Sequence, residues 1–181
     1  MAAANDGDLI ILSASYNDAI NVPAGKTIGI QLNNLTMAQP VTVAQGANVS
    51  ISGDGTISGA NSFVIDNAGT LTLLGGTYTS VSNSVINNSG SLVIDGGIYG
   101  LDNSELPIVN NSGILEIESG SFIGGSYALT SGAITGGIFN SSLPTTGNIS
   151  ISGGKFINEV ANEFIATGHT QIYREGYYVI E

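Results

Sequence analysis

The carboxylates of Asp95 and Glu118 are the one pair of ionisable groups whose spacing in this sequence suggests shared chemistry. Each carboxylate follows a short run with apolar residues at alternate positions and takes the same place after that run. If the two runs are neighbouring strands, the carboxylates lie one above the other and either attract a cation or face solvent in a turn. Asp95 and Glu118 are therefore the weak candidate for a metal site, and a solvated turn is the alternative.

The sequence lacks the residues that other kinds of catalytic site require. The chain has no Cys and a single His, His169, which leaves no thiolate nucleophile, no Cys-ligated zinc and no His-based metal site. Hydrolysis of a glycosidic bond needs two carboxylates across a groove, and only the Asp95 and Glu118 pair approaches that arrangement. We therefore predict no catalytic residues and no cofactor, and we expect a protein that is not an enzyme.

The charge balance excludes two classes of partner. Fourteen acidic side chains against three basic ones, Lys26, Lys155 and Arg174, give a net charge of −11. Nucleic acids and anionic membrane surfaces bind mainly through Lys and Arg, so we expect neither partner. The start of the chain from Met1 to Gly7 has no basic segment, and we expect no signal peptide and no membrane insertion.

Internal repeats dominate the sequence. Residues 64–78, 85–99 and 108–122 align without gaps, with Val64, Val85 and Ile108 as their first residues and offsets of 21 and 23 residues. Two shorter copies at 132–139 and 149–156 keep only the strand, the pair of small residues and the aromatic residue. A repeat of this length indicates a solenoid.

The pattern inside each repeat is that of a short strand. Apolar residues alternate with polar ones, as in Leu71-Thr72-Leu73 and Leu115-Glu116-Ile117, which is the period of a strand with one buried face. Glycine-rich joints replace any helical period between the strands. We predict an all-β fold, a single-stranded right-handed parallel β-helix of roughly seven to eight coils.

Equivalent residues of a β-helix stack in columns, and two columns stand out. An aromatic column is predicted to lie in the core, with a sugar-stacking platform as the alternative, and comprises Tyr78, Tyr99, Phe122, Phe139 and Phe156. An asparagine column of Asn67, Asn88 and Asn111 is predicted to form a structural ladder, in which each amide bonds its equivalent on the next coil.

The C-terminal segment departs from the repeat. Asn158 is predicted to cap a helix of about two turns that ends at Gly168, and residues 170–173 and 177–180 are predicted to form a hairpin. Open ends of a solenoid need such closure. We expect one domain, with the β-helix over residues 1–157 and its cap over residues 158–181.

The sequence resembles a known family at several points. Val22-Pro23-Ala24-Gly25-Lys26-Thr27-Ile28, the Gly53-Asp54-Gly55 turn, the repeated Gly-Gly-x-Tyr/Phe and the ending from Gly153 are similar to pectin-lyase-like right-handed β-helix modules of gut bacterial surface proteins and their phages. The resemblance implies the fold. Lyases of this fold use Arg or Lys beside calcium-binding carboxylates, and none of the three basic residues here stands in such a cluster.

From the resemblance we expect a non-enzymatic structural or attachment protein at the virion surface, of the head fibre, decoration or tail-spike type. Its partners would be capsid or other virion proteins or a host surface glycan, and a homotrimer is one expected assembly. The alternatives are an adhesin module at the bacterial cell surface and, third, a carbohydrate-active enzyme. The candidate contact loop comprises Leu101, Asp102, Asn103, Ser104 and Glu105, because solenoid insertions lie on the surface.

Overall fold

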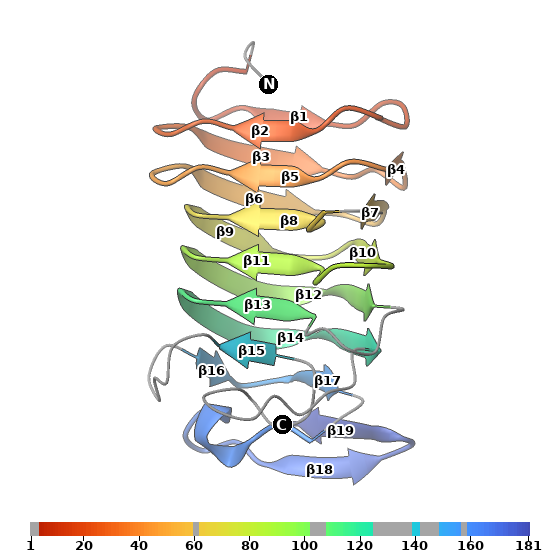
Figure 1. Cartoon of the computed structure of the whole chain (residues 1–181), viewed down its shortest axis with the longest axis vertical. Helices are drawn as coiled ribbons and strands as arrows, with labels where there is room; N and C mark the ends of the chain where they lie inside the picture. The colour runs from red at the N-terminus through yellow and green to blue at the C-terminus, as the bar shows by residue number, and fades with distance from the viewer. Residues whose placement is uncertain (1–3, 60–61, 102–107, 125–138, 142–148, 157–158) are drawn as a thin grey trace.

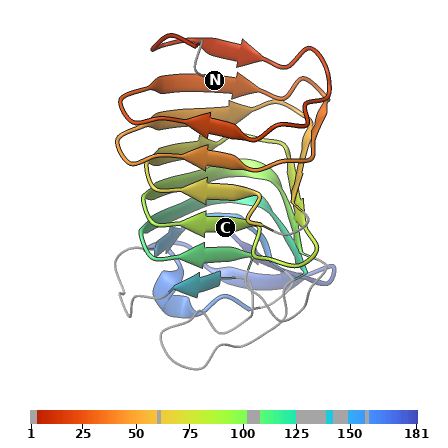
Figure 2. The same ribbon diagram turned by 45° about the horizontal axis from the view of Figure 1, so that its top comes forward.

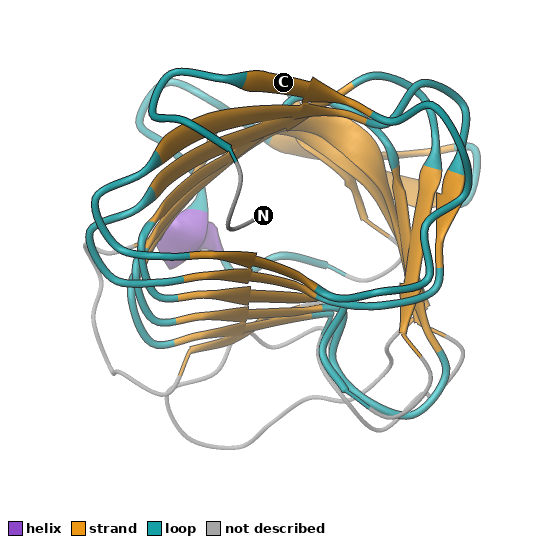
Figure 3. Ribbon diagram, turned by 90° about the horizontal axis from the view of Figure 1, so that it is seen from above, coloured by secondary structure: helices purple, strands orange, loops and turns teal. Residues whose placement is uncertain are grey.

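The computed structural model is a β-solenoid in which short parallel strands stack from one turn to the next (Figure 1). It describes residues 4–59, 62–101, 108–124, 139–141, 149–156 and 159–181. Seen from above, each turn encloses a central core with strands on three sides (Figure 3). We name these sides faces 1, 2 and 3 in the order in which the chain runs through them.

Each face is a stack of parallel strands. Face 1 comprises β1 (Leu9–Ile11), β3 (Thr27–Gln31), β6 (Asn48–Ser52), β9 (Thr70–Leu73), the first halves of β12 (Ser91–Leu101) and β14 (Ile114–Gly124), and β16 (Ile149–Ile151). Face 2 comprises β4 (Thr36–Met37), β7 (Thr56–Gly59), β10 (Thr77–Ser80), the second halves of β12 and β14, and β17 (Gly154–Phe156). Face 3 comprises β2 (Ile20–Val22), β5 (Val41–Val43), β8 (Ile65–Asn67), β11 (Ile86–Asn88), β13 (Val109–Asn111) and β15 (Phe139–Ser141).

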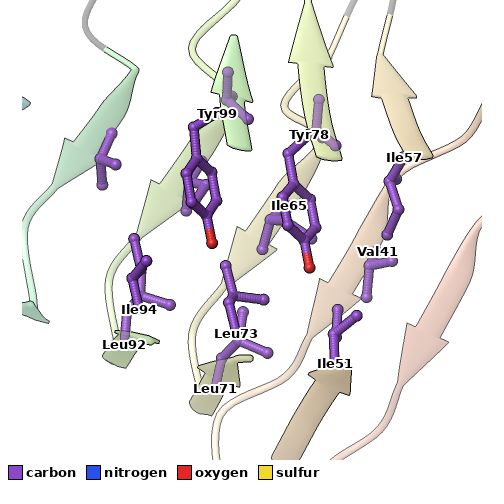
Figure 4. Packing of buried hydrophobic residues seen from close by; sticks show 14 of the residues in the cluster. Val41, Ile51, Ile57, Ile65, Leu71, Leu73, Tyr78, Leu92, Ile94 and Tyr99 are labelled. Carbon is purple, nitrogen blue, oxygen red and sulfur yellow. The ribbon is translucent and has the colours of Figure 1, made fainter. Parts of the chain in front are cut away.

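The alternating residues form the core. Leu71 and Leu73 of β9 and Leu92 and Ile94 of β12 are fully buried, while Thr72 between the first pair is only partly covered. Figure 4 shows these side chains pointing inward beside one another. Because a strand alternates its side chains between two faces, the two-residue period of the sequence places every second residue inside the solenoid. The predicted all-β parallel solenoid is confirmed.

The register confirms the three long repeats. Leu92 lies opposite Leu71 on one side and opposite Leu115 on the other, as the gap-free alignment predicts. The two short copies are different: Leu115 pairs next with Ile149, and Phe139 pairs with Val109 on face 3. Phe139, the last residue of the copy at 132–139, therefore lies on face 3, and residues 132–138 lie outside the described residues.

This difference changes the number of coils. About five turns carry strands on all three faces in the described part of the chain, fewer than the seven to eight expected. The strands β1 and β2 begin a turn before them, and β16 and β17 follow after them.

The C-terminal end is closed by a hairpin, as predicted. Strands β18 (Gln171–Arg174) and β19 (Tyr177–Ile180) pair antiparallel, and β19 also pairs antiparallel with β17 of face 2. Figure 2 shows the hairpin at the end of the stack. Face 1 is closed in the same region, where Ile165 bridges Ile151 of β16.

The predicted helix ahead of this hairpin is wrong. A single 3-10 turn, η1 (Asn162–Phe164), forms instead, and Asn158 lies outside the described residues. The side chain of Gln171 accepts a hydrogen bond from the Val160 N–H and donates one to the Val160 carbonyl, at 2.7 and 3.2 Å. In a helix that began after Asn158 the Val160 N–H would have no partner within the helix, whereas the Val160 carbonyl would accept from the Phe164 N–H. Gln171 donates to that carbonyl instead, and the Phe164 N–H donates to the Ala161 carbonyl.

Candidate binding groove

The predicted Asp95 and Glu118 pair does not share a position in the sheet. Asp95 lies opposite Ser119, and Glu118 is the extra residue of a register shift between β12 and β14. The Ser119 hydroxyl donates a hydrogen bond of 3.1 Å to the Asp95 carboxylate. The register shifts by one residue after Ile94 and shifts back before Ile98, so the repeat offset is the same on both sides and a gap-free alignment does not reveal the irregularity. Within the described residues no group of three or more His, Cys, Asp or Glu side chains is arranged to hold a metal ion.

The structure describes only the first residue of the predicted contact loop, whereas it describes His169. The backbone of Leu101 ends β12 opposite Gly124, but Asp102, Asn103, Ser104 and Glu105 lie outside the described residues. The contact loop therefore stays a prediction. His169 is exposed after the 3-10 turn, in agreement with its interpretation as a surface residue.

The aromatic column is buried and stacked. Ring centroids lie 5.1 Å apart between Tyr78 and Tyr99, 4.9 Å between Tyr99 and Phe122, and 4.9 Å between Phe122 and Phe156, all nearly parallel. All four residues are 0% exposed, which confirms the core interpretation and excludes these rings as a sugar platform. Phe139 was wrongly assigned to the column, because its strand belongs to face 3.

Each tyrosine of this column also forms a hydrogen bond to the bend between faces 1 and 2. The hydroxyl of Tyr78 donates to the Gly75 carbonyl at 2.8 Å, and that of Tyr99 donates to the Gly96 carbonyl at 2.9 Å. Burial raises the pKa of both phenols above the usual value, and the neighbouring Tyr78 raises the pKa of Tyr99 further. Both hydroxyls therefore stay protonated donors.

The bend above these rings requires glycine. Gly97 has a φ of +90°, and a Cβ there would lie 3.0 Å from both the Tyr99 hydroxyl and the Gly76 carbonyl oxygen. Gly76 also has a φ of +90°, with the Tyr78 hydroxyl 3.2 Å from an added Cβ. Left-handed backbone and close contact both favour glycine, which explains the small-residue pair of each repeat.

These bends line a groove that crosses several coils. Its first part, about 250 Å³, and its middle part, about 390 Å³, share Gly97, and the middle part shares Lys155 and Val179 with a last part of about 530 Å³. We call these three adjoining hollows together the glycine groove. It is lined by Asp54, Gly55, Gly75, Gly76, Thr77, Gly96, Gly97, Ile98, Ser119, Gly120, Ser121, Gly154, Lys155, Arg174, Glu175, Tyr177 and Val179.

The groove offers backbone and apolar contacts. Within the described part of the chain, the N–H groups of Gly75 and Gly76 have no hydrogen-bond acceptor. Two successive N–H groups beside a residue with positive φ can bind a ligand oxygen. Ile98 lines the groove and is 44% exposed, and Leu74, next to Gly75, is 48% exposed. The glycines can be read from the sequence, but the groove cannot be predicted from it, because only the stacking of coils brings these glycines together.

The asparagine column is a buried hydrogen-bonded ladder, as predicted. The Asn67 amide donates to the Asn88 side-chain oxygen at 2.7 Å, and the Asn88 amide donates to that of Asn111 at 2.6 Å. All three residues are 0% exposed and lie on extended strands. The ladder joins consecutive coils and is structural.

A second ladder, which we did not predict from the sequence, lies on face 3 one residue before each asparagine of the buried ladder. Asn110 donates to Asn87 and Asn87 donates to Asp66, each at 2.9 Å, with all three side chains partly exposed. The bonds run toward the N-terminus, opposite to those of the buried ladder. The recurring polar residue before each column asparagine is the signal that could have predicted it.

Comparison with known proteins finds no matching family model, no matching curated protein and no matching solved structure. In the parts of the chain that the structure describes, no helix is long and apolar enough to cross a membrane.

Proposed function

We propose that this chain is a non-enzymatic attachment protein of a phage virion surface, of the head fibre, decoration or tail-spike type, and that the glycine groove holds a host surface glycan. The observation that carries the proposal is the continuity of the groove across coils, from Asp54 to the C-terminal hairpin. A groove that crosses successive coils suits a chain-shaped ligand better than a compact one.

The walls of the groove support a sugar ligand. The backbone N–H groups of Gly75 and Gly76, which have no acceptor among the described residues, suit hydroxyl oxygens, and the exposed side chain of Ile98 suits the apolar face of a sugar ring. The glycines and the stacked aromatic rings beneath them fix the shape of the groove before binding. A preformed site lowers the entropic cost of association.

The test is binding of fluorescently labelled protein to a panel of gut bacterial cells, with competition by their purified surface glycans. Ile98→Glu places a charged side chain in the groove and is expected to reduce binding at least about tenfold. The matched control, Ile114→Glu, changes the net charge equally at a position on face 1 that is 57% exposed. Equal binding by both variants would contradict the proposed groove.

Electron microscopy with antibodies against the chain separates the virion from the alternatives. Labelling of phage particles is the expected result. Labelling of bacterial cells without phage would instead favour the adhesin module, and shortening of the bound glycan would favour a carbohydrate-active enzyme. We also propose a homotrimer, for which light scattering should give three times the 18.3 kDa of one chain.

A further inference from the structure

Lys155 stands at the junction of the middle and last parts of the glycine groove. Its strand, β17, places it on face 2 directly opposite Ser121 on one side and Val179 on the other. Lys155 and Val179 line both parts of the groove. A ligand that follows the groove toward the hairpin must therefore pass this side chain.

Lys155 also has no partner among the described residues, in contrast to the other two basic residues. Lys26 donates a hydrogen bond to the Ala4 carbonyl at 2.9 Å, and both terminal nitrogens of Arg174 bond the Glu181 carboxylate at 3.2 Å. The exposed Lys155 ammonium has no hydrogen bond or ion pair among the described residues. In a chain with a net charge of −11, this is a local site of positive charge.

The middle part of the groove contains no second charge. Apart from Lys155 it is lined by glycines, two serines and Val179, whereas Glu175 lines only the last part. Asp95 lies close by, but its carboxylate accepts the hydrogen bond from Ser119. The Ser121 hydroxyl has no partner among the described residues and lies opposite Lys155 in the register. An ammonium and a hydroxyl side by side are donors suited to a carboxylate.

We propose that Lys155 and Ser121 form a subsite for an acidic sugar, whose carboxylate they bind while its ring lies over Gly120 and Gly154. Glycine at these two positions leaves no side chain between the ring and the backbone. The inference rests on the proposed function, because it assigns a chemical class to one residue of the glycan. It does not require the ligand to be acidic elsewhere.

The test uses two monosaccharides that differ only in the group at C6. Methyl β-D-glucuronide and methyl β-D-glucoside are titrated separately, and the amide resonances of Gly120, Gly154 and Lys155 are followed by NMR. We expect the glucuronide to bind at least about tenfold more tightly, with saturable shifts at these residues that weaken as salt is raised. Equal affinity for the two sugars, or no saturable shift with the glucuronide, would overturn the subsite.

Variants assign the effect to the pair. Lys155→Gln should remove the preference for the glucuronide, and Ser121→Ala should reduce it, whereas Lys26→Gln changes the charge equally outside the groove and should retain it. A preference that survives in Lys155→Gln contradicts the proposal. Lys155 is exposed, so an unchanged melting temperature is the expected control for folding.

The two proposals fail in different ways. Cell binding that depends on Ile98, without a preference for the glucuronide, retains the glycan groove and removes the acidic subsite. Saturable glucuronide binding without cell binding retains an anion site on the groove and removes the attachment function.

Discussion

The two buried columns of the solenoid both join successive coils, one through stacked aromatic rings and the other through side-chain hydrogen bonds. The aromatic column and the asparagine ladder are both 0% exposed and both add one residue per coil. Stacked rings need no matched donor and acceptor, so the column changes from Tyr99 to Phe122 and continues to Phe156. The ladder requires a donor and an acceptor at each step from Asn67 through Asn88 to Asn111. A change from Tyr to Phe preserves the stacking, whereas loss of one amide would break the ladder.

The largest effect is expected from removing a ring in the middle of the aromatic column. Phe122→Ala leaves a cavity between Tyr99 and Phe156 and should lower the free energy of unfolding by about 4 kcal/mol, measured by urea denaturation. Ile123→Ala, at the next position and 40% exposed, is the matched control and should cost less than about 1 kcal/mol. Similar losses in the two variants would show that the column does not act as a continuous core.

The polar column is tested by a pair of neighbouring asparagines with the same hydrogen-bond chemistry. Asn88→Ala removes the middle of the buried ladder, leaves Asn111 without its donor and should lower the unfolding free energy by about 3 kcal/mol. Asn87→Ala interrupts the outer ladder, where water replaces the lost partner, and should cost about 0.5 kcal/mol. Equal losses of unfolding free energy in urea denaturation would show that burial does not determine how much a ladder contributes to stability.

Of the two columns, alkaline pH should destabilise only the aromatic one, because asparagine does not titrate. Burial raises the pKa of Tyr78 and Tyr99 above the usual 10.0, so the unfolded chain loses these protons first. Their contribution to stability is complete below pH 10 and falls as the pH rises above it, by about 1 kcal/mol per tyrosine near pH 11. Urea denaturation at pH 9 and at pH 11 measures the loss of unfolding free energy. From pH 9 to pH 11, a variant with both Tyr78→Phe and Tyr99→Phe should lose about 2 kcal/mol less than the wild type. An identical loss in both proteins would contradict this origin.

The regular coils could be predicted from the sequence because their information is local. Alternation in runs such as Leu71-Thr72-Leu73 sets the strands, and the gap-free alignment of the three long repeats gives the register of the two columns. The errors lie where residues distant in the sequence come into contact. Gln171 bonds the backbone of Val160 where a helix was expected, and Phe139 follows the register of face 3 although its local sequence copies an aromatic repeat.

The candidate site was less predictable for the same physical reason. One bulge separates Asp95 from Glu118, and no local pattern marks an inserted residue of this kind. The groove depends on the hairpin, which returns Val179 to Lys155 after the chain has completed its last coil. Its glycines are visible in the sequence, but their alignment into one surface is a property of the stack.

A smaller effect on the aromatic column is expected from Tyr99→Phe, which keeps the ring and removes only the hydroxyl. The Gly96 carbonyl loses its donor, and the unfolding free energy should fall by about 1 kcal/mol at pH 7 in urea denaturation. The control is Tyr173→Phe on the exposed hairpin, where no change is expected because the phenol is solvated. Phe122 already occupies this column without a hydroxyl, so a loss above about 3 kcal/mol would mean that the tyrosine coils depend on directed bonds as the asparagine ladder does. That result would remove the distinction between the two columns.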